Sequence, residues 1–588
     1  MIQLFKYLNK KQWLLIFASV VLIVGQVFLD LKLPDFMKEI TTLLKSGGTT
    51  GQILTNGGYM LGCALISALL AVGVGFMSAK IGAGLSFSLR DAVYKKIATF
   101  SPTEMRKFKV SSLITRSTND ITQIQQSVAM GLQVIIKAPL TAVWAIVKIV
   151  NRSWQLSLVT GIAVAILVFG MTTIIAISIP KFKIVQKQTD ELNRVARENL
   201  TGVRVIRAFS AEQYMENKFS TVNNNLTRTH LFTGYTMSFM NPLMHTVMNG
   251  LSLAIYVVGA FLLDATLGFS ARLDMFTDIT TFFSLAMQII SSFLMMIMIF
   301  MILPRAQVSS KRIKEVLDTV PSISDGKGVS PSEKGTIKFD NVSFMYSDAK
   351  EPVLKNISFE AKQGERVAII GATGSGKSTI IKLLPRLFDV TDGAIYVDGE
   401  NVKDYKLNDL YDRIGYISQR AVLFSGTVES NVAMGTKANQ KASEDKIVEA
   451  IEHAQSTTFV QNMNGTYKAK IFQGGTNVSG GQKQRLTIAR ALARDPEILI
   501  FDDSFSALDY QTDKNLRKTL EENFSDTTCI IVAQRIGTIK NCDKILVIEN
   551  GEIVGIGKHE ELLKNCKVYK QIALSQLSKE ELDNGTSK

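Results

Sequence analysis

Six long apolar segments are the feature that most restricts how this chain can fold. Of its 588 residues, 46% are hydrophobic, and all six segments lie before residue 304. About 20 apolar residues in a helix are enough to cross the hydrocarbon core of a bilayer, where only helices and closed barrels satisfy their own backbone groups. We therefore expect six transmembrane helices, the first being a membrane span rather than a cleaved leader. The segments cover roughly residues 13–33, 57–79, 131–150, 155–178, 243–263 and 279–303.

The positive charge of the chain predicts its orientation. The formal net charge is +14, and Lys and Arg crowd residues 80–116 and 181–228, while the short loops near Asn151 and Ala271 carry few. Basic residues accumulate on the cytoplasmic side of a membrane. We expect a multi-pass plasma-membrane protein with a cytoplasmic N-terminus, and we do not expect nucleic acid as a partner.

Composition divides the chain into a membrane part and a soluble part. Residues 1–304 form the predicted transmembrane domain, whose long charged connections suit helices that continue beyond the bilayer. A Pro- and Gly-containing stretch, 305–335, predicts a linker. Residues 336–575 mix strand and helix patterns and predict a cytoplasmic α/β domain, and the polar residues 576–588 predict a disordered tail.

A phosphate-binding loop follows the predicted strand Arg366–Ile370. Glycines there allow backbone N–H groups to surround phosphates, Lys377 is suited to the β- and γ-phosphates, and Ser378 to Mg²⁺. The strand, loop and helix order predicts a site for ATP and Mg²⁺. Its residues are Gly371, Ala372, Thr373, Gly374, Ser375, Gly376, Lys377, Ser378 and Thr379.

An apolar strand ending in two acids completes the nucleotide site. Residues Ile498–Asp502 read as a buried parallel strand that presents Asp502 to Mg²⁺ at its carboxyl end. The next residue, Asp503, occupies the position of the group that polarises the attacking water. Aspartate is one methylene shorter than glutamate, and a misplacement of about 1 Å can cost on the order of a hundredfold in rate. We expect good ATP binding and poor hydrolysis.

The segment Asn477–Arg485 reads Asn-Val-Ser-Gly-Gly-Gln-Lys-Gln-Arg and opens a predicted helix. It resembles the signature sequence of ATP-binding cassette (ABC) proteins. With the P-loop and the acidic strand, the resemblance to half-transporters of the ABC exporter family covers nearly the whole chain. In that family two nucleotide domains close head to tail around two ATP molecules. The resemblance assigns Ser479, Gly480, Gly481 and Gln482 to the ATP held by the partner.

The same resemblance implies roles for three further residues. Tyr346 matches the aromatic residue that stacks on adenine, and Gln419 matches the glutamine that contacts Mg²⁺ and the attacking water. Asp509, in Ser506-Ala-Leu-Asp509, matches the loop that links the two ATP sites. The regions 104–113 and 199–207 resemble the transverse helices that couple the membrane helices to the nucleotide domains.

Three positions depart from the family pattern. Asp503 replaces the catalytic glutamate, Gln534 replaces a histidine that contacts the γ-phosphate, and Gln473 replaces a glutamate before the signature. A glutamine cannot bring a protonated histidine's charge to the transferring phosphoryl group. Two such changes at one ATP site imply the non-catalytic subunit of a heterodimer, whose partner carries the catalytic Glu and His.

The predicted function is ATP-driven export of small hydrophobic or amphiphilic compounds, such as drugs, by a membrane-embedded heterodimer. Met287, Met298 and Met301 suit a deformable substrate surface on the sixth span, or a stripe that packs against helices or lipid. Lys137 and Lys148, in the third span, either extend toward the membrane surfaces or face a water-filled cavity. A lipid or peptide exporter and an ATP-gated channel or regulatory subunit remain alternatives.

Overall fold

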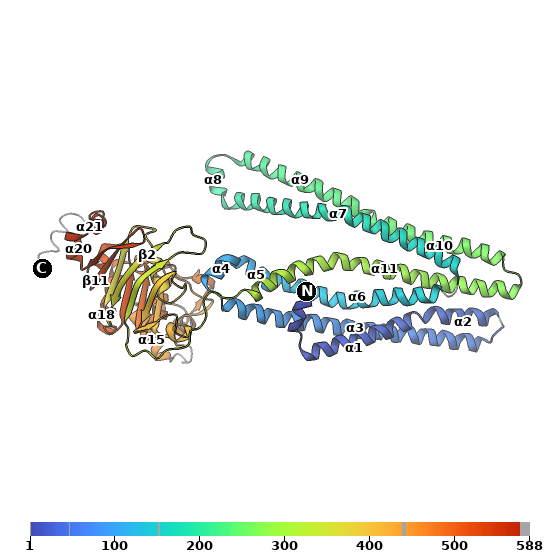
Figure 1. Ribbon diagram of the computed structural model, residues 1–588, viewed down its shortest axis with the longest axis horizontal. Helices are drawn as coiled ribbons and strands as arrows, with labels where there is room; N and C mark the ends of the chain where they lie inside the picture. The colour runs from blue at the N-terminus through green and yellow to red at the C-terminus, as the bar shows by residue number, and fades with distance from the viewer. Residues whose placement is uncertain (1, 46, 151–152, 438–442, 577–588) are drawn as a thin grey trace. The chain divides into compact units, whose positions relative to one another are not determined.

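The computed structural model describes residues 2–45, 47–150, 153–437 and 443–576 (Figure 1). The chain divides into two compact units, which are described separately. One contains residues 1–98 and 110–319, and the other contains residues 99–109 and 320–588. The short segment 99–109 thus belongs to the second unit, although it lies in sequence between two membrane helices. The predicted disordered tail lies almost entirely outside the described residues.

The first unit is all helical in its described part. Six stretches are long and apolar enough to cross a membrane, in the order and number predicted. Its helices are α1 (Lys10–Asp30), α2 (Leu33–Lys45), α3 (Thr50–Ala98), α5 (Val110–Thr115), α6 (Ile121–Val150), α7 (Trp154–Thr201), α8 (Val203–Ala208), α9 (Glu212–Ser238), α10 (Met240–Asp264) and α11 (Phe269–Asp318), with a 3₁₀ turn at Ile2–Tyr7 and a π turn at Arg116–Asp120.

Large apolar side chains lie on the outside of these helices. Phe17, Leu69 and Phe169 are each about two-thirds or more exposed. Water would penalise such a surface, whereas lipid would not. The exposed apolar faces therefore support a membrane-embedded bundle.

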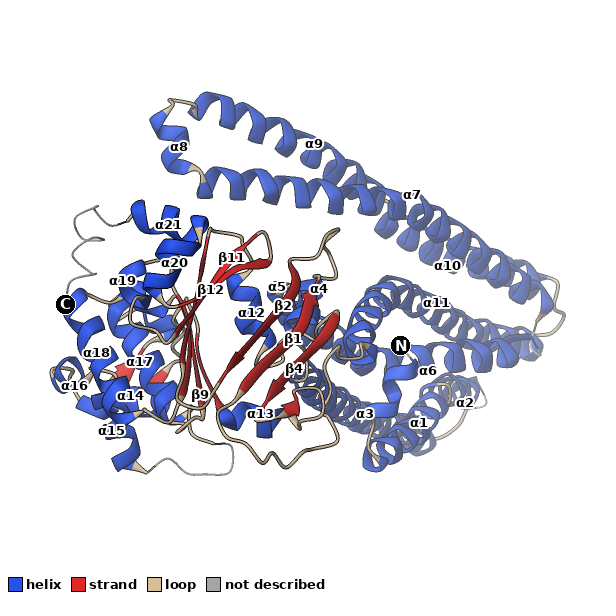
Figure 2. Cartoon of the chain, turned by 60° about the vertical axis from the view of Figure 1, so that its left-hand side comes forward, coloured by secondary structure: helices blue, strands red, loops and turns tan. Residues whose placement is uncertain are grey.

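Within the membrane unit, α1, α3, α6 and α11 run side by side, whereas α7 and α9 form a hairpin that projects from them (Figures 1 and 2). Residues Ile23 and Val27 of α1 join Leu285 and Ile289 of α11 in one buried apolar cluster. The long helices α3 and α7 confirm that the charged connections continue as helix.

The structure corrects some predicted boundaries. The linker was expected from residue 305, but α11 continues through Pro304 to Asp318. A proline removes one helical hydrogen bond and need not end a helix that neighbours hold in place. Here Asp120 pairs with Arg312, an ion pair that links the last part of α11 to the π turn that precedes α6.

The predicted transverse region 104–113 is divided in two. Helix α4 (Pro102–Phe108) is separated from α5 by Lys109, whose φ of 56° breaks the helix. In the second region, Asn199–Thr201 still belong to α7, and the short helix is α8.

The second unit is an α/β domain, as predicted, and its described part contains three sheets. Besides α4, its elements are β1 (Ile337–Phe344), β2 (Leu354–Ala361), β3 (Arg366–Gly371), α12 (Lys377–Leu383), β4 (Asp392–Val397), β5 (Glu400–Asn401), α13 (Leu407–Arg413), β6 (Ile414–Ile417), β7 (Gly426–Thr427), α14 (Val428–Ala433), α15 (Glu444–His453), α16 (Thr457–Gln461), β8 (Lys470–Ile471), α17 (Gly480–Leu492), β9 (Ile498–Asp502), α18 (Tyr510–Asn523), β10 (Thr528–Val532), α19 (Ile536–Ile539), β11 (Lys544–Glu549), β12 (Glu552–Gly557), α20 (His559–Asn565) and α21 (Lys567–Leu574), with 3₁₀ turns at Thr466–Lys468, Gln473–Gly475 and Ser504–Ala507.

The main sheet has the strand order β12-β11-β3-β10-β9-β6, and all of its pairs are parallel except β11–β12. Every residue of β9 and β10 is buried. Strands covered on both faces read as continuous apolar runs. In Figure 2, helices α14 to α18 cover one side of this sheet, and β1, β2 and β4 of the antiparallel sheet lie on the other. The carboxyl ends of β3, β9 and β10 meet at one edge, where the candidate site forms.

Candidate nucleotide site

The loop between β3 and α12 is shaped by its glycines. A Cβ on Gly371 would stand 2.1 Å from the Ile548 carbonyl oxygen and 2.8 Å from Ser375 Oγ. Gly374 and Gly376 have φ values of 86° and 105°, which favour glycine. The local sequence therefore determines a tight backbone loop at the start of a helix.

Two polar side chains in this loop bear on anion binding. Lys377 is buried, and its Nζ donates to the carbonyl oxygens of Gly371 (2.8 Å) and Ala372 (2.7 Å). Burial lowers the pKa of Lys377, and the nearby Asp503 charge partly opposes this. Ser375 Oγ is buried and has no hydrogen-bond partner among the described residues. An unpaired hydroxyl and a desolvated ammonium in a glycine cradle fit a polyphosphate.

Asp502, the last residue of β9, collects two hydroxyl donors. Ser378 Oγ lies 3.1 Å from Asp502 Oδ1, and the Tyr416 hydroxyl lies 3.2 Å from Asp502 Oδ2. A serine hydroxyl beside a carboxylate offers the hard oxygen ligands that Mg²⁺ prefers. The donor set thus fits the predicted metal. The sequence reading missed Tyr416, although its place on β6, next to β9, could have suggested it.

Asp503 lies at the centre of an amide network. Its φ is 50°, and its N–H donates to the Val532 carbonyl oxygen at 3.0 Å. Its Oδ2 accepts from Gln534 Nε2 at 2.9 Å and from Gln419 Nε2 at 3.3 Å. The structure therefore brings together all three residues predicted for the hydrolytic position.

The electrostatics of Asp503 follow from this position. Burial raises the pKa of Asp503, and the neighbouring Asp502 charge adds to the rise, while the Gln419 hydrogen bond opposes it. The Asp503 carboxylate is thus close to the negative charge of Asp502, and it already accepts hydrogen bonds from two neutral amide groups. This bond between Gln534 and Asp503 was not predicted.

Tyr346 lies just beyond β1 in an aromatic group. Phe344 and Phe388 meet its ring edge-on, with centroids 4.8 Å and 5.3 Å away, and its hydroxyl lies 3.1 Å from Thr379 Oγ1. Arg106 of α4 places its guanidinium carbon 4.7 Å from the ring centroid. The bond to Thr379 places Tyr346 beside the P-loop helix. No sequence signal pointed to Arg106, which is far from Tyr346 along the chain.

At the start of α17, Ser479 and Gly480 are exposed, and Gly481 and Gln482 are half-buried. Ser479 and Gln482 form a capping box, with Ser479 N–H donating to Gln482 Oε1 at 2.9 Å and Gln482 N–H donating to Ser479 Oγ at 3.3 Å. A Cβ on Gly481 would stand 3.3 Å from the Ala507 carbonyl oxygen, whereas one on Gly480 would meet nothing within 4 Å. These residues form a separate, prepared helix N-terminus.

Asp509 and Gln473 are the last of the residues singled out in the sequence. Asp509 caps α18, accepting from Thr512 N–H at 2.9 Å, and its bonds to Thr512 lower the pKa of Asp509. Gln473, which is exposed, begins a 3₁₀ turn ahead of the signature.

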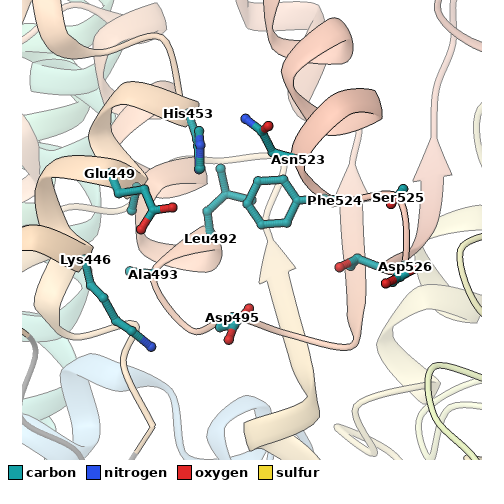
Figure 3. Close-up of a pocket in the computed structure, with 12 residues that line it drawn as sticks. Lys446, Glu449, His453, Leu492, Ala493, Asp495, Asn523, Phe524, Ser525 and Asp526 are labelled. Atoms are coloured by element: carbon teal, nitrogen blue, oxygen red, sulfur yellow. The ribbon is translucent and has the colours of Figure 1, made fainter.

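A hollow of about 560 Å³ lies elsewhere in this unit, lined by charged and polar side chains including Lys446, Glu449, His453 and Asn523 (Figure 3). It is bordered by Asp495 and Thr527, which precede β9 and β10. The hollow is therefore at the amino ends of the strands, opposite the P-loop edge, and is not the nucleotide site.

Comparison with known proteins identifies the family. The family description "ABC transporter transmembrane region" matches residues 16–293, and "ABC transporter" matches residues 354–506. The chain is 38% identical to an uncharacterized ABC transporter ATP-binding protein of Mycobacterium tuberculosis over 93% of both chains. It is also 30% identical to an ATP-dependent lipid A-core flippase of Mannheimia succiniciproducens, covering 84% of this chain and 83% of that protein.

The fold is similar to that of a solved structure, a bacterial Atm1-family ABC exporter with ATP bound. The TM-score is 0.81 and the sequence identity is 22%, and the match covers 97% of this chain and 99% of the exporter chain. This likeness confirms the predicted fold class, a six-helix membrane domain followed by an ABC nucleotide-binding domain. The multi-pass plasma-membrane localisation is likewise confirmed. The chain belongs to the ABC transporter family, as a half-transporter of the exporter type with its own ATPase domain.

Proposed function

We propose that this chain is one subunit of a heterodimeric ABC exporter, and that its own site binds Mg²⁺-ATP but hydrolyses it slowly. One observation carries the proposal: the Asp503 carboxylate accepts amide hydrogen bonds from both Gln534 and Gln419. The position that should activate water is occupied by a short acid whose Oδ2 already has two donors.

The chemistry of phosphoryl transfer explains why this arrangement should be slow. A general base must reach the water proton within hydrogen-bond distance, and the transferring phosphoryl group needs positive charge nearby. Asp503 is shorter than glutamate, and Gln534 is neutral. Bound ATP would therefore serve mainly to hold the two nucleotide domains together.

The signature of this chain is intact and can serve a partner. The Ser479–Gln482 box leaves the N-terminus of α17 exposed and ordered, and helix N-termini favour phosphate. We assign Ser479, Gly480, Gly481 and Gln482 to the ATP on the partner's P-loop, and Asp509 to the link between sites. The partner would supply the catalytic Glu and His.

Exposed apolar side chains on and around α8 support a second chain as well. Val203, Val205 and Phe209 are each at least half exposed. This end of the hairpin lies outside the predicted spans, so lipid does not cover it. We propose that α8 docks on the partner's nucleotide domain, which would remove these side chains from water.

The proposed substrates are hydrophobic or amphiphilic compounds. Of the predicted methionine stripe, Met287 is partly buried, whereas Met298 and Met301 lie outside the described side chains. Lipid export is a second candidate, because two of the relatives, each 30% identical, are named ATP-dependent lipid A-core flippases. Flipping of a fluorescent lipid by the reconstituted complex would favour lipid export over drug export.

Copurification and ATPase assays test the subunit proposal. The chain should be purified alone and together with whatever half-transporter copurifies from its native membrane. We expect both preparations to bind ATP and only the mixed complex to hydrolyse it rapidly. Rapid, substrate-stimulated hydrolysis by a verified homodimer would overturn the proposal.

A further inference from the structure

Four helices of the membrane unit each contribute one polar side chain to a single cluster, which we term the Asp30 cluster. It consists of Asp30 at the end of α1, Ser67 of α3, Lys137 of α6 and Gln288 of α11. Lys137 Nζ lies 3.2 Å from Asp30 Oδ2, and Ser67 Oγ donates to Asp30 Oδ1. Gln288 Nε2 donates to the Asp30 carbonyl oxygen at 3.2 Å.

Three members of the cluster lie well inside predicted spans, Ser67 in 57–79, Lys137 in 131–150 and Gln288 in 279–303, while Asp30 is close to the end of the span 13–33. Lys137 precedes the end of α6 at Val150 by 13 residues, or about 20 Å at 1.5 Å per residue. A hydrocarbon core is about 30 Å thick. Lys137 is therefore too far from the outer membrane surface to reach it from its position on α6. Of the two alternatives for Lys137, extension to the outer surface is thus excluded, and the lysine is instead paired with an acid inside the bundle.

Two other ion pairs of the same unit provide a comparison. Lys148 Nζ lies 2.7 Å from Asp35, and Lys38 Nζ lies 2.7 Å from Asp278. Lys148 is two residues from the end of α6, and Lys38 lies in α2, beyond the apolar segment. These pairs are close to the outer ends of the spans. Among the ion pairs of the described residues, only Lys137–Asp30 has both members inside predicted spans.

Stability alone does not account for a charged pair at this depth. Charged residues at the centre of a span are costly, and replacing a buried ion pair by apolar residues is often neutral or stabilising. The Lys137 and Asp30 side chains also remain 24% and 27% exposed. The pair is thus expensive and incompletely enclosed, which is typical of a functional site in a membrane protein.

The cluster has unused hydrogen-bonding capacity. An ammonium group carries three donors, and the structure gives Lys137 one partner, Asp30, in the described part of the chain. Gln288 Oε1 is buried and has no hydrogen-bond partner there. An unpaired buried amide oxygen can accept a hydrogen bond from a further donor. The cluster can therefore accept a polar guest.

Charge balance defines that guest. Asp30 and Lys137 together are neutral, so a guest with a net charge would leave one charge uncompensated in a medium of low dielectric constant. A guest with both an anionic and a cationic group can pair with Lys137 and Asp30 at once. We propose that the Asp30 cluster binds the zwitterionic headgroup of an amphiphile, with its anionic oxygen on Lys137 and its cationic group on Asp30. This inference rests on the proposed export function and specifies its substrate class.

Binding to the full-length protein in nanodiscs, without hydrolysis, tests the proposal. The probes are fluorescent amphiphiles with identical chains and zwitterionic phosphocholine, anionic phosphate or cationic ammonium headgroups. We expect the wild-type protein to favour the phosphocholine probe over both others. Asp30→Asn/Lys137→Met removes both charges without leaving one unpaired, and should lower phosphocholine binding at least about tenfold. The matched control, Asp35→Asn/Lys148→Met, should bind as the wild type does.

Three results would overturn the proposal: equal binding of all three headgroups, unchanged selectivity in the Asp30/Lys137 double variant, or an equal loss in the control. A two-chain phosphatidylcholine and a single-chain alkylphosphocholine, compared as competitors, would distinguish a membrane lipid from a soluble amphiphile as the source. Because the assay does not use ATP hydrolysis, a failed heterodimer proposal would leave it unaffected. Conversely, an active exporter that binds no zwitterion would refute this inference alone.

Discussion

Restoring two residues should convert this chain into an active ATPase. The double variant Asp503→Glu/Gln534→His supplies the longer carboxylate and a group that can carry positive charge. It keeps the intact signature at Ser479–Gln482, so two copies of the variant would contain every residue that the family pattern requires at this site. The prediction needs no partner subunit.

The magnitude follows from the geometry at Asp503. Adding a methylene moves the carboxylate by about 1 Å, and a misplacement of that size costs on the order of a hundredfold. Asp503→Glu alone should recover little, because Gln534, now 2.9 Å from Asp503 Oδ2, would still occupy the carboxylate and bring no charge. Replacing the amide as well should raise the rate at least about a hundredfold, since one oriented donor to the reacting group is worth about 10²–10³.

The assay is phosphate release from Mg²⁺-ATP by the full-length chain in nanodiscs, with ATP binding measured in parallel. Asp503→Asn should hydrolyse no faster than the wild type. Adding Lys377→Ala to the double variant should abolish the gained activity, which places it at this P-loop. If the double variant binds ATP and assembles as a dimer but remains as slow as the wild type, the reasoning about Asp503 and Gln534 is wrong.

Further predictions concern single residues of the nucleotide domain. In the mixed complex, Lys377→Ala should slow hydrolysis modestly. Ser479→Ala should reduce steady-state ATPase activity about a hundredfold, because donors to the reacting phosphate are worth about 2.7–4 kcal/mol. If Lys377→Ala has the larger effect, Lys377 serves the hydrolytic site and our assignment of the two sites is wrong. Gly371→Ala should destabilise the domain by about 1–3 kcal/mol through overpacking, while Gly537→Ala, whose Cβ meets nothing within 4 Å, should not, as judged by thermal unfolding. Tyr346→Ala should weaken ATP binding by about 1–3 kcal/mol, the value of one base stacked on an aromatic ring. Tyr346→Phe should retain most of the affinity for a fluorescent ATP analogue in a titration. Equal losses of affinity in the two variants would exclude stacking.

Local patterns in the sequence predicted the fold class, and they marked the residues that the structure places around the P-loop. Apolar runs of membrane length gave six spans, because the bilayer permits few alternatives to a helix. The P-loop could be recognised because its glycines are needed for local reasons. A Cβ on Gly371, for example, would clash with the Ile548 carbonyl oxygen. Asp502 was expected at a strand end because parallel strands present their carboxyl ends together.

Contacts between distant segments could not be predicted. Gln534 contacts Asp503 because β10 pairs with β9, which places Val532 opposite Asp502. The sequences of these two segments do not show that the strands are neighbours in the sheet. Lys137 meets Asp30 through the packing of four helices. The end of α11 also contacts a distant segment, through the Arg312–Asp120 ion pair, so the Pro and Gly content of 305–335 placed the start of the linker too early.

A single-turnover experiment on the wild-type chain tests the central claim most directly. The purified chain, without any partner and verified as a dimer, is loaded with radiolabelled Mg²⁺-ATP, and the bound nucleotide is recovered over time. The account predicts that it is recovered mainly as ATP, long after the Asp503→Glu/Gln534→His variant has converted its own to ADP. Conversion to ADP at the same rate in both proteins would contradict the account.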